Sequence, residues 1–476
     1  MFDSNGRSIP SFDVAVIGAG VVGCAIARAL SHFRLDIALV EASNDVGTGT
    51  SKANSAILHS GFDAPPRSLE SKLVSRGHRM LTDYAAAVDI PLQRVGATLV
   101  AWPSDDSASL DRIQSRAVEN GYRSVERLTA EQVYTREPRL ATGAVNGLAI
   151  PDESIVCPFT TPLALASEAV ANGVTLLLDS PLRSAQRADG RWELDLGRAQ
   201  ISARWVVNAA GLHGDSVARL FDSSSPEIRP RRGQFVIFDK TAGDLVNTIV
   251  LGVPTPLSKG VLLAPTVFGN LLLGPTAEDV ETKDATETTE SGISRLLDQG
   301  RALVPDLAGV EVTSTYAGLR AVPDTGDYHI DVDQASGYGC AIGIRSTGLS
   351  AAMAIAEHLV NLLSDDGLSL ESKAPRDRVS MAYIGEAKLR PHRDEASIAK
   401  DPDAGRVICF CELTTLAELE RSATSPIPPT SIDGVWRRTR ATGGRCQGFY
   451  CRAHVVEWLA TKSGQTANAL LKAGAE

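Results

Sequence analysis

The chain has 476 residues, of which 43% are hydrophobic and 22% are charged, and its formal net charge is −10 at pH 7. This length exceeds what one hydrophobic core serves, so we expect roughly two to four domains. The acidic surplus argues against nucleic acid as a main partner. The polar, acidic N-terminus lacks the basic and apolar run of an export signal, so we expect a cytoplasmic protein whose thiols are reduced.

The first predicted element is a short strand at 14–17, followed by the turn "GAGVVG" and a helix of small residues at 24–30. A second apolar strand, 37–40, ends at Glu41, which lies 23 positions after Gly18. A strand, a tight turn, a helix, a strand and an acidic residue in this register predict one βαβ half of a dinucleotide-binding fold.

The three glycines of that turn have separate roles. Gly18 allows the tight turn, Gly20 lets a pyrophosphate approach the backbone, and Gly23 allows the helix to pack closely on the strand. The phosphates then rest on the positive end of the helix, and Glu41 binds ribose hydroxyls. No second βαβ half follows, and a later strand ends in the small residues "NAAG", 208–211, whose backbone can lie against a bound dinucleotide. This combination favours FAD over NAD.

The rest of the chain divides into recognisable blocks. A helix is predicted at 68–88, and short alternating strands with turn residues fill 96–151 and 230–321, which is typical of an antiparallel sheet. An uncharged stretch at 260–277 approaches membrane-spanning length, but its prolines and glycines divide it into the two strands of a hairpin. The sequence therefore predicts no transmembrane segment and leaves peripheral membrane contact open. A charged, weakly periodic stretch at 364–406 indicates a long connector with room for one helix.

Residues 13–363 resemble one known family. The chain is similar to the D-amino-acid-oxidase-like FAD-dependent oxidoreductases, and within them to the glycerol-3-phosphate dehydrogenase and L-2-hydroxyglutarate dehydrogenase relatives. The motifs that carry the resemblance are "VAVIGAGVVGCAIA", "NSAILHSGFD", "VVNAAGLHGDSVA", "SKGVLLAPTVFGNLLLGPTAE", "YAGLRAVPDTGDY" and "GIRSTGLSAAMAIAEH".

The resemblance implies a discontinuous α/β Rossmann-like FAD-binding domain, an α+β substrate domain whose antiparallel sheet covers the flavin, and a small C-terminal iron–sulfur module. The expected boundaries are 10–95, 151–229 and 322–364 for the FAD domain, 96–150 and 230–321 for the substrate domain, 365–405 for the linker, and 406–470 for the module.

Family membership also implies which residues meet the cofactor. The segment "RSTGL" is expected at the flavin, and Gly348 would open a helix whose N-terminal dipole stabilises the negative charge that builds on reduction. The further cofactor-binding residues expected from the resemblance are Thr50, Ser51, Asn54, Ala210, Gly211, Arg345, Thr347 and Leu349.

Three residues are candidates for the substrate site. Arg320, in the "GLR" strand, matches the family position that binds a carboxylate or phosphate, for which a planar guanidinium is suited. The residue after it is Ala321 instead of the frequent proline, which puts the local rigidity in doubt. His59 is expected to face the flavin, to accept the hydroxyl proton, or to be linked to the flavin; the alternative is a hydrogen-bonded core histidine. Lys259 is either an anion ligand or an exposed hairpin lysine.

Four of the seven cysteines fall within 43 residues near the C-terminus: Cys409, Cys411, Cys446 and Cys451. Their pattern is C-x-C, 34 residues, then C-x4-C, and the spacing alone leaves zinc and an iron–sulfur cluster open. The segment also resembles the bacterioferritin-associated-ferredoxin-like [2Fe-2S] domain over about 406–460, which implies that the four thiolates bind a [2Fe-2S] cluster.

We therefore expect an FAD- and [2Fe-2S]-dependent dehydrogenase that takes a hydride from a small anionic 2-hydroxy acid or polyol phosphate. Electrons would leave through the cluster to a one-electron carrier, a quinone or a partner subunit. Two alternatives stay open at this point. The enzyme could oxidise an amino acid or imino acid, or the chain could be an electron-transfer subunit without a substrate of its own, in which case the position of Arg320 would be blocked.

Overall fold

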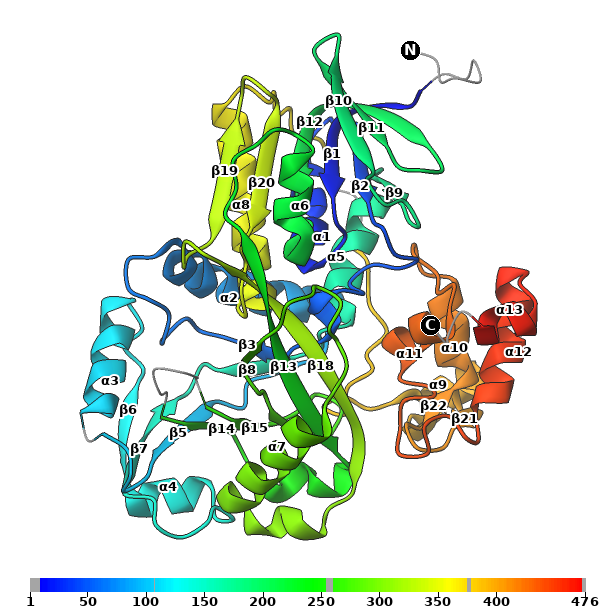
Figure 1. The fold of residues 1–476 in the computed structure, drawn as a ribbon. Helices are drawn as coiled ribbons and strands as arrows, with labels where there is room; N and C mark the ends of the chain where they lie inside the picture. Colours follow the sequence, from blue (N-terminus) through cyan, green and yellow to red (C-terminus); the bar gives the residue numbers. More distant parts are fainter. Residues whose placement is uncertain (1–8, 107, 254–259, 375–377, 473–476) are drawn as a thin grey trace.

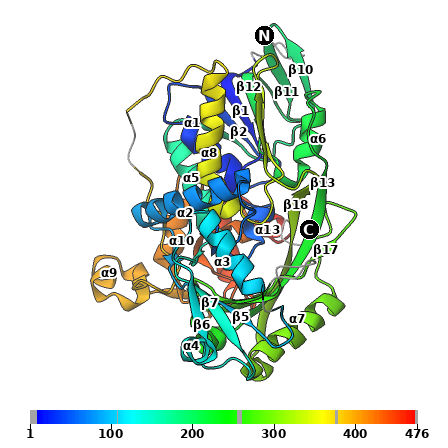
Figure 2. The same ribbon diagram turned by 90° about the vertical axis from the view of Figure 1, so that its left-hand side faces the viewer.

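The computed structural model describes residues 9–106, 108–253, 260–374 and 378–472, and it has three lobes (Figure 1). The upper lobe is a sheet covered by helices, the lower lobe is a second sheet, and the C-terminal cysteine module lies beside both. Figure 2 shows the same molecule from the side, with the upper and lower sheets joined through the long strands that cross between them. Within the described ranges, no helix combines the length and the apolar character needed to span a membrane.

The upper sheet is built on the predicted βαβ unit. Strand β1 (Ser11–Ile17) is parallel to β2 (Ile37–Val40) on one side and to β12 (Gln200–Asn208) on the other. The sheet continues through β9 (Thr175–Leu177) beyond β2, and through parallel β20 (Tyr338–Ile342) beyond β12. Antiparallel strands complete it: β10 (Ser184–Ala188), β11 (Arg191–Asp195) and β19 (His329–Asp333).

Small residues allow the helices to pack tightly on this sheet. Helix α1 (Val21–Leu30) lies between α5 (Thr160–Ala171) and α8 (Gly348–Asp365), and α8 also contacts α2 (Leu69–Val88). Helix α2 begins where predicted, because the side chain of Ser68 accepts a hydrogen bond from the backbone of Ser71 and caps it. Since α1 begins at Val21 and α8 begins at Gly348, the nucleotide domain is assembled from segments that lie far apart in the sequence.

The lower sheet is mixed. The prediction of a wholly antiparallel sheet is therefore wrong for one pair of strands. Strands β5 (Ala97–Ala101) and β14 (Ile249–Gly252) run parallel. The chain between them passes through the upper lobe, so no hairpin turn forces them to be antiparallel. The predicted hairpin is present as β15 (Leu262–Pro265) and β16 (Leu271–Gly274). The other strands are β6 (Glu126–Thr129), β7 (Asn146–Ile150), β13 (Ile228–Phe238), β17 (Glu278–Asp279) and β18 (Val312–Pro323).

Helices α3 (Ser109–Glu119), α4 (Ala130–Arg136) and α7 (Glu290–Leu303) belong to the lower lobe. A small sheet of β3 (Ile57–Leu58), β8 (Ser154–Val156) and β4 (Leu92–Gln93) connects the two lobes. Helix α6 (Gly214–Arg219) follows the "NAAG" segment. The hydrophobic core under α1, α5 and α8 extends into residues of β5 and β14, so the lobes share one continuous core.

The C-terminal module has its own apolar cluster, which includes Cys409 and Cys451. It consists of β21 (Val407–Cys409), β22 (Thr414–Thr415), α10 (Leu416–Ala423), α11 (Ile432–Thr439), α12 (Arg452–Ser463) and α13 (Ala467–Lys472). The connector before it contains α9 (Glu395–Lys400). Buried Arg390 joins connector to module by donating to Glu418 at 2.8 Å.

A buried ion cluster holds the module to the nucleotide domain. Asp45, in the loop after β2, accepts hydrogen bonds from Arg437 at 2.7 Å and from Arg438 at 2.6 and 2.9 Å. All three side chains are at most 6% exposed. Burial by itself would raise the pKa of Asp45, but the hydrogen bonds and charges of Arg438 and Arg437 outweigh burial and lower it. The carboxylate is therefore ionised at neutral pH.

Replacing Asp45 by alanine leaves two arginines buried without their anion, which should destabilise docking by about 3 kcal/mol or more. We expect hydrogen exchange of the α11 amides to show this loss of protection. The exposed carboxylate of Asp433, at the start of the same helix, provides the control: Asp433→Ala should change protection by less than about 1 kcal/mol. Because the pKa of Asp45 is lowered on folding, its stabilisation is full above about pH 4 and is lost as the pH falls further. Equal exchange in the two variants would show that the cluster does not hold the module.

Candidate active site between the nucleotide domain and the cysteine module

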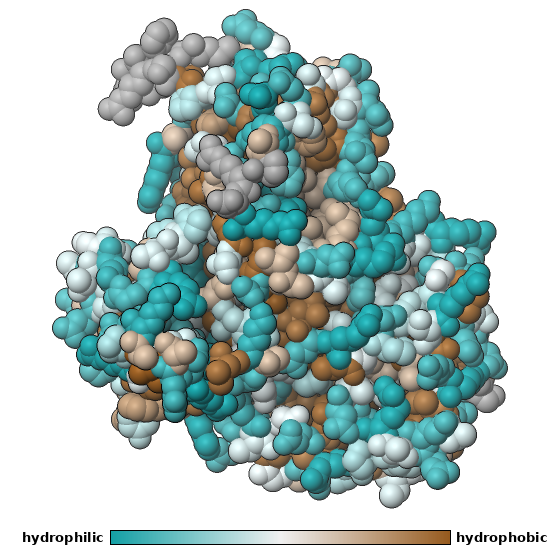
Figure 3. Space-filling view, turned by 180° about the vertical axis from the view of Figure 1, so that it is seen from behind, coloured by the Kyte–Doolittle hydropathy of each residue, from teal (hydrophilic) through white to brown (hydrophobic). Residues whose placement is uncertain are grey.

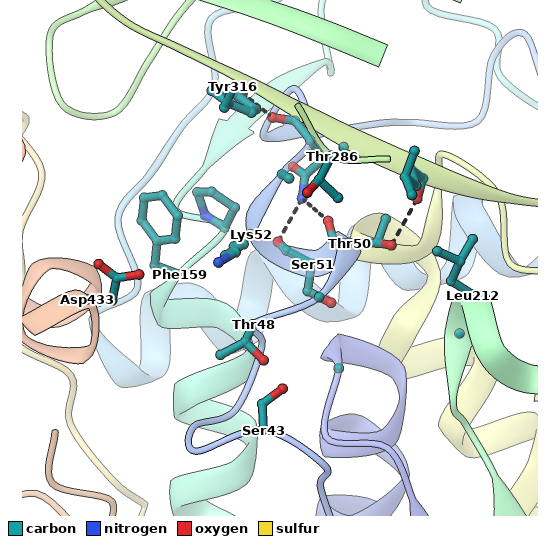
Figure 4. Close-up of a pocket in the computed structure, with 18 of the residues that line it drawn as sticks. Ser43, Thr48, Thr50, Ser51, Lys52, Phe159, Leu212, Thr286, Tyr316 and Asp433 are labelled. Atoms are coloured by element: carbon teal, nitrogen blue, oxygen red, sulfur yellow. Dashed lines mark hydrogen bonds between the residues drawn. The ribbon is translucent and has the colours of Figure 1, made fainter. Parts of the chain in front are cut away.

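A cavity of about 1240 Å³ runs between the three lobes. Its walls include the glycine turn and Glu41, and also the aromatic side chains of Phe159, Phe268 and Trp436. Seen from behind, the surface is largely hydrophilic, and hydrophobic side chains gather in the middle of the face where the lobes meet (Figure 3). The close-up shows residues of all three lobes facing this space, with Asp433 of the module beside Phe159 and Lys52 (Figure 4).

The glycine turn has the close contacts that a dinucleotide site requires. A Cβ on Gly23 would lie 1.8 Å from the carbonyl oxygen of Gly18, so only glycine lets α1 sit this near the turn. Gly18 itself has φ +100°, a conformation that favours glycine. Gly18 and Gly20 line the cavity, whereas Gly23 packs behind them. The turn therefore combines a positive φ at Gly18 with the close approach of α1 at Gly23, and contact of the glycines with a pyrophosphate stays a prediction.

Glu41 and Ser51 organise the start of α1. Glu41 accepts a hydrogen bond from the backbone N–H of Ala19 at 2.8 Å, and Ser51 Oγ accepts one from Val21 N–H at 2.9 Å. Both side chains line the cavity, and so do the backbone segments of Ala210 and Gly211 opposite them. The N-terminus of α1 thus faces the cavity with polar groups on both sides, which suits a pyrophosphate.

The loop after Ser51 is fastened to β18. Thr50 Oγ1 donates to the carbonyl of Leu319 at 2.9 Å, and the Tyr316 hydroxyl donates to the carbonyl of Asn54 at 2.7 Å (Figure 4). The Asn54 amide in turn donates to Ser51 O at 2.7 Å. Thr50, Ser51 and Asn54 all line the cavity, and their side chains hold the loop in place. Their contact with FAD stays a prediction.

The "RSTGL" segment does not line this cavity. Thr347 Oγ1 donates to Glu70 at 2.7 Å, Arg345 forms an ion pair with the same carboxylate, and the Tyr328 hydroxyl lies 2.5 Å from Thr347 Oγ1. These contacts fasten the start of α8, including Gly348 and Leu349, to α2. Contact of the "RSTGL" residues with the flavin stays a prediction. Glu70, the carboxylate that binds Arg345 and Thr347, was not predicted from the sequence.

His59 is paired with a buried carboxylate. Its Nδ1 lies 3.0 Å from Glu153 Oε2, and the Glu153 side chain is 1% exposed. Glu153 also accepts hydrogen bonds from the backbone and hydroxyl of Ser60, each at 2.7 Å. A carboxylate that is held this firmly fixes the orientation of the imidazole ring. Glu153 was not predicted, and its only sequence signal is its place directly before a short apolar strand.

Arg320 is buried in the lower lobe. Its guanidinium donates a long hydrogen bond, 3.4 Å, to the carbonyl of Thr276, and it crowds the backbone of Gly233. Burial lowers the pKa of Arg320 to about 10, and the positive charge of Arg231 adds to this effect. Arg320 does not line the cavity described above, and Lys259 lies outside the described residues. The role of Arg320 in binding an anion stays a prediction, and so does that of Lys259.

The four clustered cysteines form two neighbouring pairs. The thiol of Cys409 interacts with that of Cys451, and the thiol of Cys411 interacts with that of Cys446. In the described ranges, no three His, Cys, Asp or Glu side chains converge tightly enough to hold a metal ion as they stand.

Backbone N–H groups surround the cysteine sulfurs. The backbone of Thr442 interacts with the thiols of both Cys409 and Cys451, and the backbone of Tyr450 interacts with the thiol of Cys446. Amides directed at sulfur stabilise thiolates, as in iron–sulfur sites. Thr442 also lines the large cavity, so one segment of the module contacts both the cavity and the cysteine cluster.

A discontinuous Rossmann-like domain, a single βαβ half and a sheet placed over the cavity define an FAD-dependent oxidoreductase of the D-amino-acid-oxidase type. The family profile described as "FAD dependent oxidoreductase" matches residues 13–362, and the chain belongs to this family.

Two relatives and one solved structure show the similarity in detail. The chain is 36% identical over 455 residues to a glycerol 3-phosphate dehydrogenase of Caloramator mitchellensis, covering 95% of each protein. It is 30% identical over 366 residues to a glycerol 3-phosphate oxidase of Mycoplasma pneumoniae, covering 74% of this chain and 94% of the relative. The structure of dithionite-reduced L-α-glycerophosphate oxidase from Mycoplasma pneumoniae with FAD bound has a TM-score of 0.71 and 28% identity, covering 77% of this chain and 97% of that one. FAD is accordingly the cofactor of this chain.

Replacing Gly23 by alanine should expel FAD, because the new methyl group displaces α1 from the turn that receives the pyrophosphate. We expect the variant to bind FAD at least about tenfold more weakly and to carry less flavin absorbance per chain after purification, since a loss of 1.4 kcal/mol raises the dissociation constant tenfold. Gly309→Ala is the control, because a Cβ there meets no atom within 4 Å. Full flavin content in Gly23→Ala would refute the close-packing argument.

Proposed function

We propose that the chain oxidises the C–H bond beside a hydroxyl group in a small anionic substrate, and that a polyol phosphate such as glycerol 3-phosphate is that substrate. The observation that carries this proposal is the 36% identity to a glycerol 3-phosphate dehydrogenase over 95% of both chains. A 2-hydroxy acid is the second candidate, because the L-2-hydroxyglutarate dehydrogenases of several eukaryotes are 25–29% identical over shorter regions. An amino-acid substrate has weaker support, since the glycine oxidase and L-proline dehydrogenase structures match at 22% identity or less.

The nucleotide site supplies the oxidant. Gly18, Gly20 and Ser51 would hold the pyrophosphate at the start of α1, and Glu41 the ribose. FAD, when bound, accepts the hydride from the substrate carbon. The segment from Thr50 to Asn54, tied to β18, would position the substrate domain over the cofactor.

His59 is the proposed base for the substrate hydroxyl proton. Glu153 contacts Nδ1 at 3.0 Å and holds the imidazole ring in one orientation. The Glu153 carboxylate, which contacts Nδ1, would also stabilise the imidazolium that forms when the His59 ring accepts the proton. Arg320 would bind the substrate's anionic group, and its positive charge at neutral pH agrees with a pKa of about 10.

The cysteine module is proposed to carry electrons away. Its four thiols and the amides around Cys409, Cys446 and Cys451 fit a [2Fe-2S] cluster, provided that the two thiol pairs close around the iron. If these four thiols hold a cluster, it would supply one-electron transfer toward a carrier, a quinone or a partner subunit. The adjacency of Thr442 to both the cavity and the sulfurs supports a short path. We therefore favour a dehydrogenase over an oxidase.

Glycerol 3-phosphate should bleach the flavin when it is added without oxygen, and L-2-hydroxyglutarate and amino acids should bleach it more slowly. Arg320→Lys should lower kcat/KM by roughly 30- to 1000-fold, since it removes a bidentate, charge-assisted contact in a dry site, while FAD content stays unchanged. If none of these metabolites reduces the flavin, the electron-transfer subunit becomes the better interpretation. An unchanged kcat/KM would assign Arg320 to structure.

Purified protein should contain two iron and two sulfide per chain, as a [2Fe-2S] cluster requires. Cys446→Ser should lose iron and keep FAD, because the cysteines lie outside the nucleotide domain. Turnover with a one-electron acceptor should exceed turnover with air, and this excess should vanish in the variant. Cys157→Ser, at a buried cysteine far from the four in sequence, is the control and should keep its iron. One zinc per chain without iron, or electron transfer at the wild-type rate in Cys446→Ser, would contradict the cluster.

A further inference from the structure

Exposed aromatic side chains surround the cysteine site. Phe410 stands between two of the clustered cysteines, and Phe449 and Tyr450 directly precede a third. Their exposed fractions are 68%, 82% and 65%, and no other Phe, Tyr or Trp among the residues that the structure describes is comparably exposed. Because the thiols of Cys409 and Cys451 interact, the two segments that carry the rings meet at one place on the module.

An ordered loop holds two of these rings in solvent. The backbone N–H of Gln447 donates to the carbonyl of Gly444 at 2.8 Å, and the Gln447 side chain donates to the carbonyl of Thr313 in β18 at 3.0 Å. The rings of Phe449 and Tyr450 pack edge to face, with 5.1 Å between their centroids. The fold therefore presents these rings to solvent, and large apolar side chains gathered at one exposed place are typical of an interaction site.

The charge around the rings is positive. The stretch 443–456 contains Arg445 and Arg452 and no Asp or Glu, and Glu412, which follows the first cysteine pair, is only 4% exposed. Carboxylates of the substrate domain offset part of this charge, the nearest being Glu311, which lies 2.9 Å from Arg445. The chain as a whole has a net charge of −10, so this face is opposite in sign to the rest of the protein. A partner that selects this face is therefore acidic.

We propose that Phe410, Phe449 and Tyr450 form the docking surface for a small acidic one-electron carrier protein, which collects electrons from the cysteine site. This inference rests on the proposed function in assigning electron transfer to the cysteines. Each docking event would move one electron from the cysteine site to an oxidised carrier. Two carriers accept the two electrons of one oxidised substrate molecule, and its two protons pass to solvent. Complexes of redox proteins are small and transient, so a few rings and two arginines suffice for such a partner.

A membrane surface is the other partner with which aromatic and basic side chains make contact. Basic clusters that bind anionic lipid hold roughly four to eight Lys or Arg. The stretch 443–456 has two arginines, and the net charge of −10 opposes approach to an anionic surface. Aromatic rings beside arginine are, in contrast, the typical composition of a protein–protein interface. These observations favour a protein partner.

The first test is calorimetric titration of an acidic [2Fe-2S] ferredoxin into the FAD-loaded enzyme. We expect binding at low salt that weakens as the salt concentration rises. The double variant Phe410→Ser/Phe449→Ser should raise the dissociation constant roughly tenfold or more, because two rings no longer become buried in the complex. Val118→Ser is the matched control, at an exposed valine of α3 across the lower lobe from the module, and it should leave the affinity unchanged (Figure 1). Cytochrome c, a basic carrier, should not respond to the double substitution.

The double variant should keep its iron and its rate of flavin bleaching by glycerol 3-phosphate, because both rings lie in solvent. If it loses iron, Phe449→Ser, at the most exposed ring, replaces it in the titration. Failure of the ferredoxin to bind, or equal affinity in wild type and variants, overturns the proposal. It is also overturned if the rings instead mediate binding to phosphatidylglycerol vesicles or dimerisation of the enzyme. An enzyme that binds ferredoxin through the rings and is not reduced by glycerol 3-phosphate would refute the proposed substrate and support the docking surface.

Discussion

The ion cluster of Asp45 with Arg437 and Arg438 determines how the lobes of this protein work together. A carboxylate and two guanidinium groups are buried at one interface, and none of them is stable there without the others. Because the arginines are on α11, their pairing orients the end of that helix, and with it Arg440 and Thr442, toward the nucleotide cavity. The shape of the cavity therefore depends on the docking of the module.

This arrangement gives the cavity walls different chemical characters. The nucleotide domain contributes backbone amides and a helix N-terminus, the substrate domain contributes β18 and its hydroxyl groups, and the module contributes aromatic rings and cations. Hydrogen bonds from Thr50 and Tyr316 close the seam between the first two.

Much of the nucleotide domain was predictable, because its signals are local. The glycine spacing, the strand at 37–40, the helix at 68–88 and the hairpin at 260–277 all depend on residues within one element or turn, and the structure contains them. Contacts between distant segments were not predictable. The Glu153 partner of His59 is 94 positions away, and the Glu70 partner of Arg345 is 275 positions away. The parallel pairing of β5 with β14 escaped prediction for the same reason.

The sequence by itself determined the class of chemistry, since a glycine turn and an acidic residue in register define a dinucleotide site wherever the lobes lie. It also determined where four thiols cluster along the chain. Only the tertiary structure decided which cations reach the cavity. Arg320, expected there from its strand, is buried in the lower lobe beside Thr276, whereas Arg440, which has no distinguishing motif, lines the cavity. The physical reason is that side-chain direction depends on how domains dock, and docking here depends on charge pairs that join residues almost four hundred positions apart.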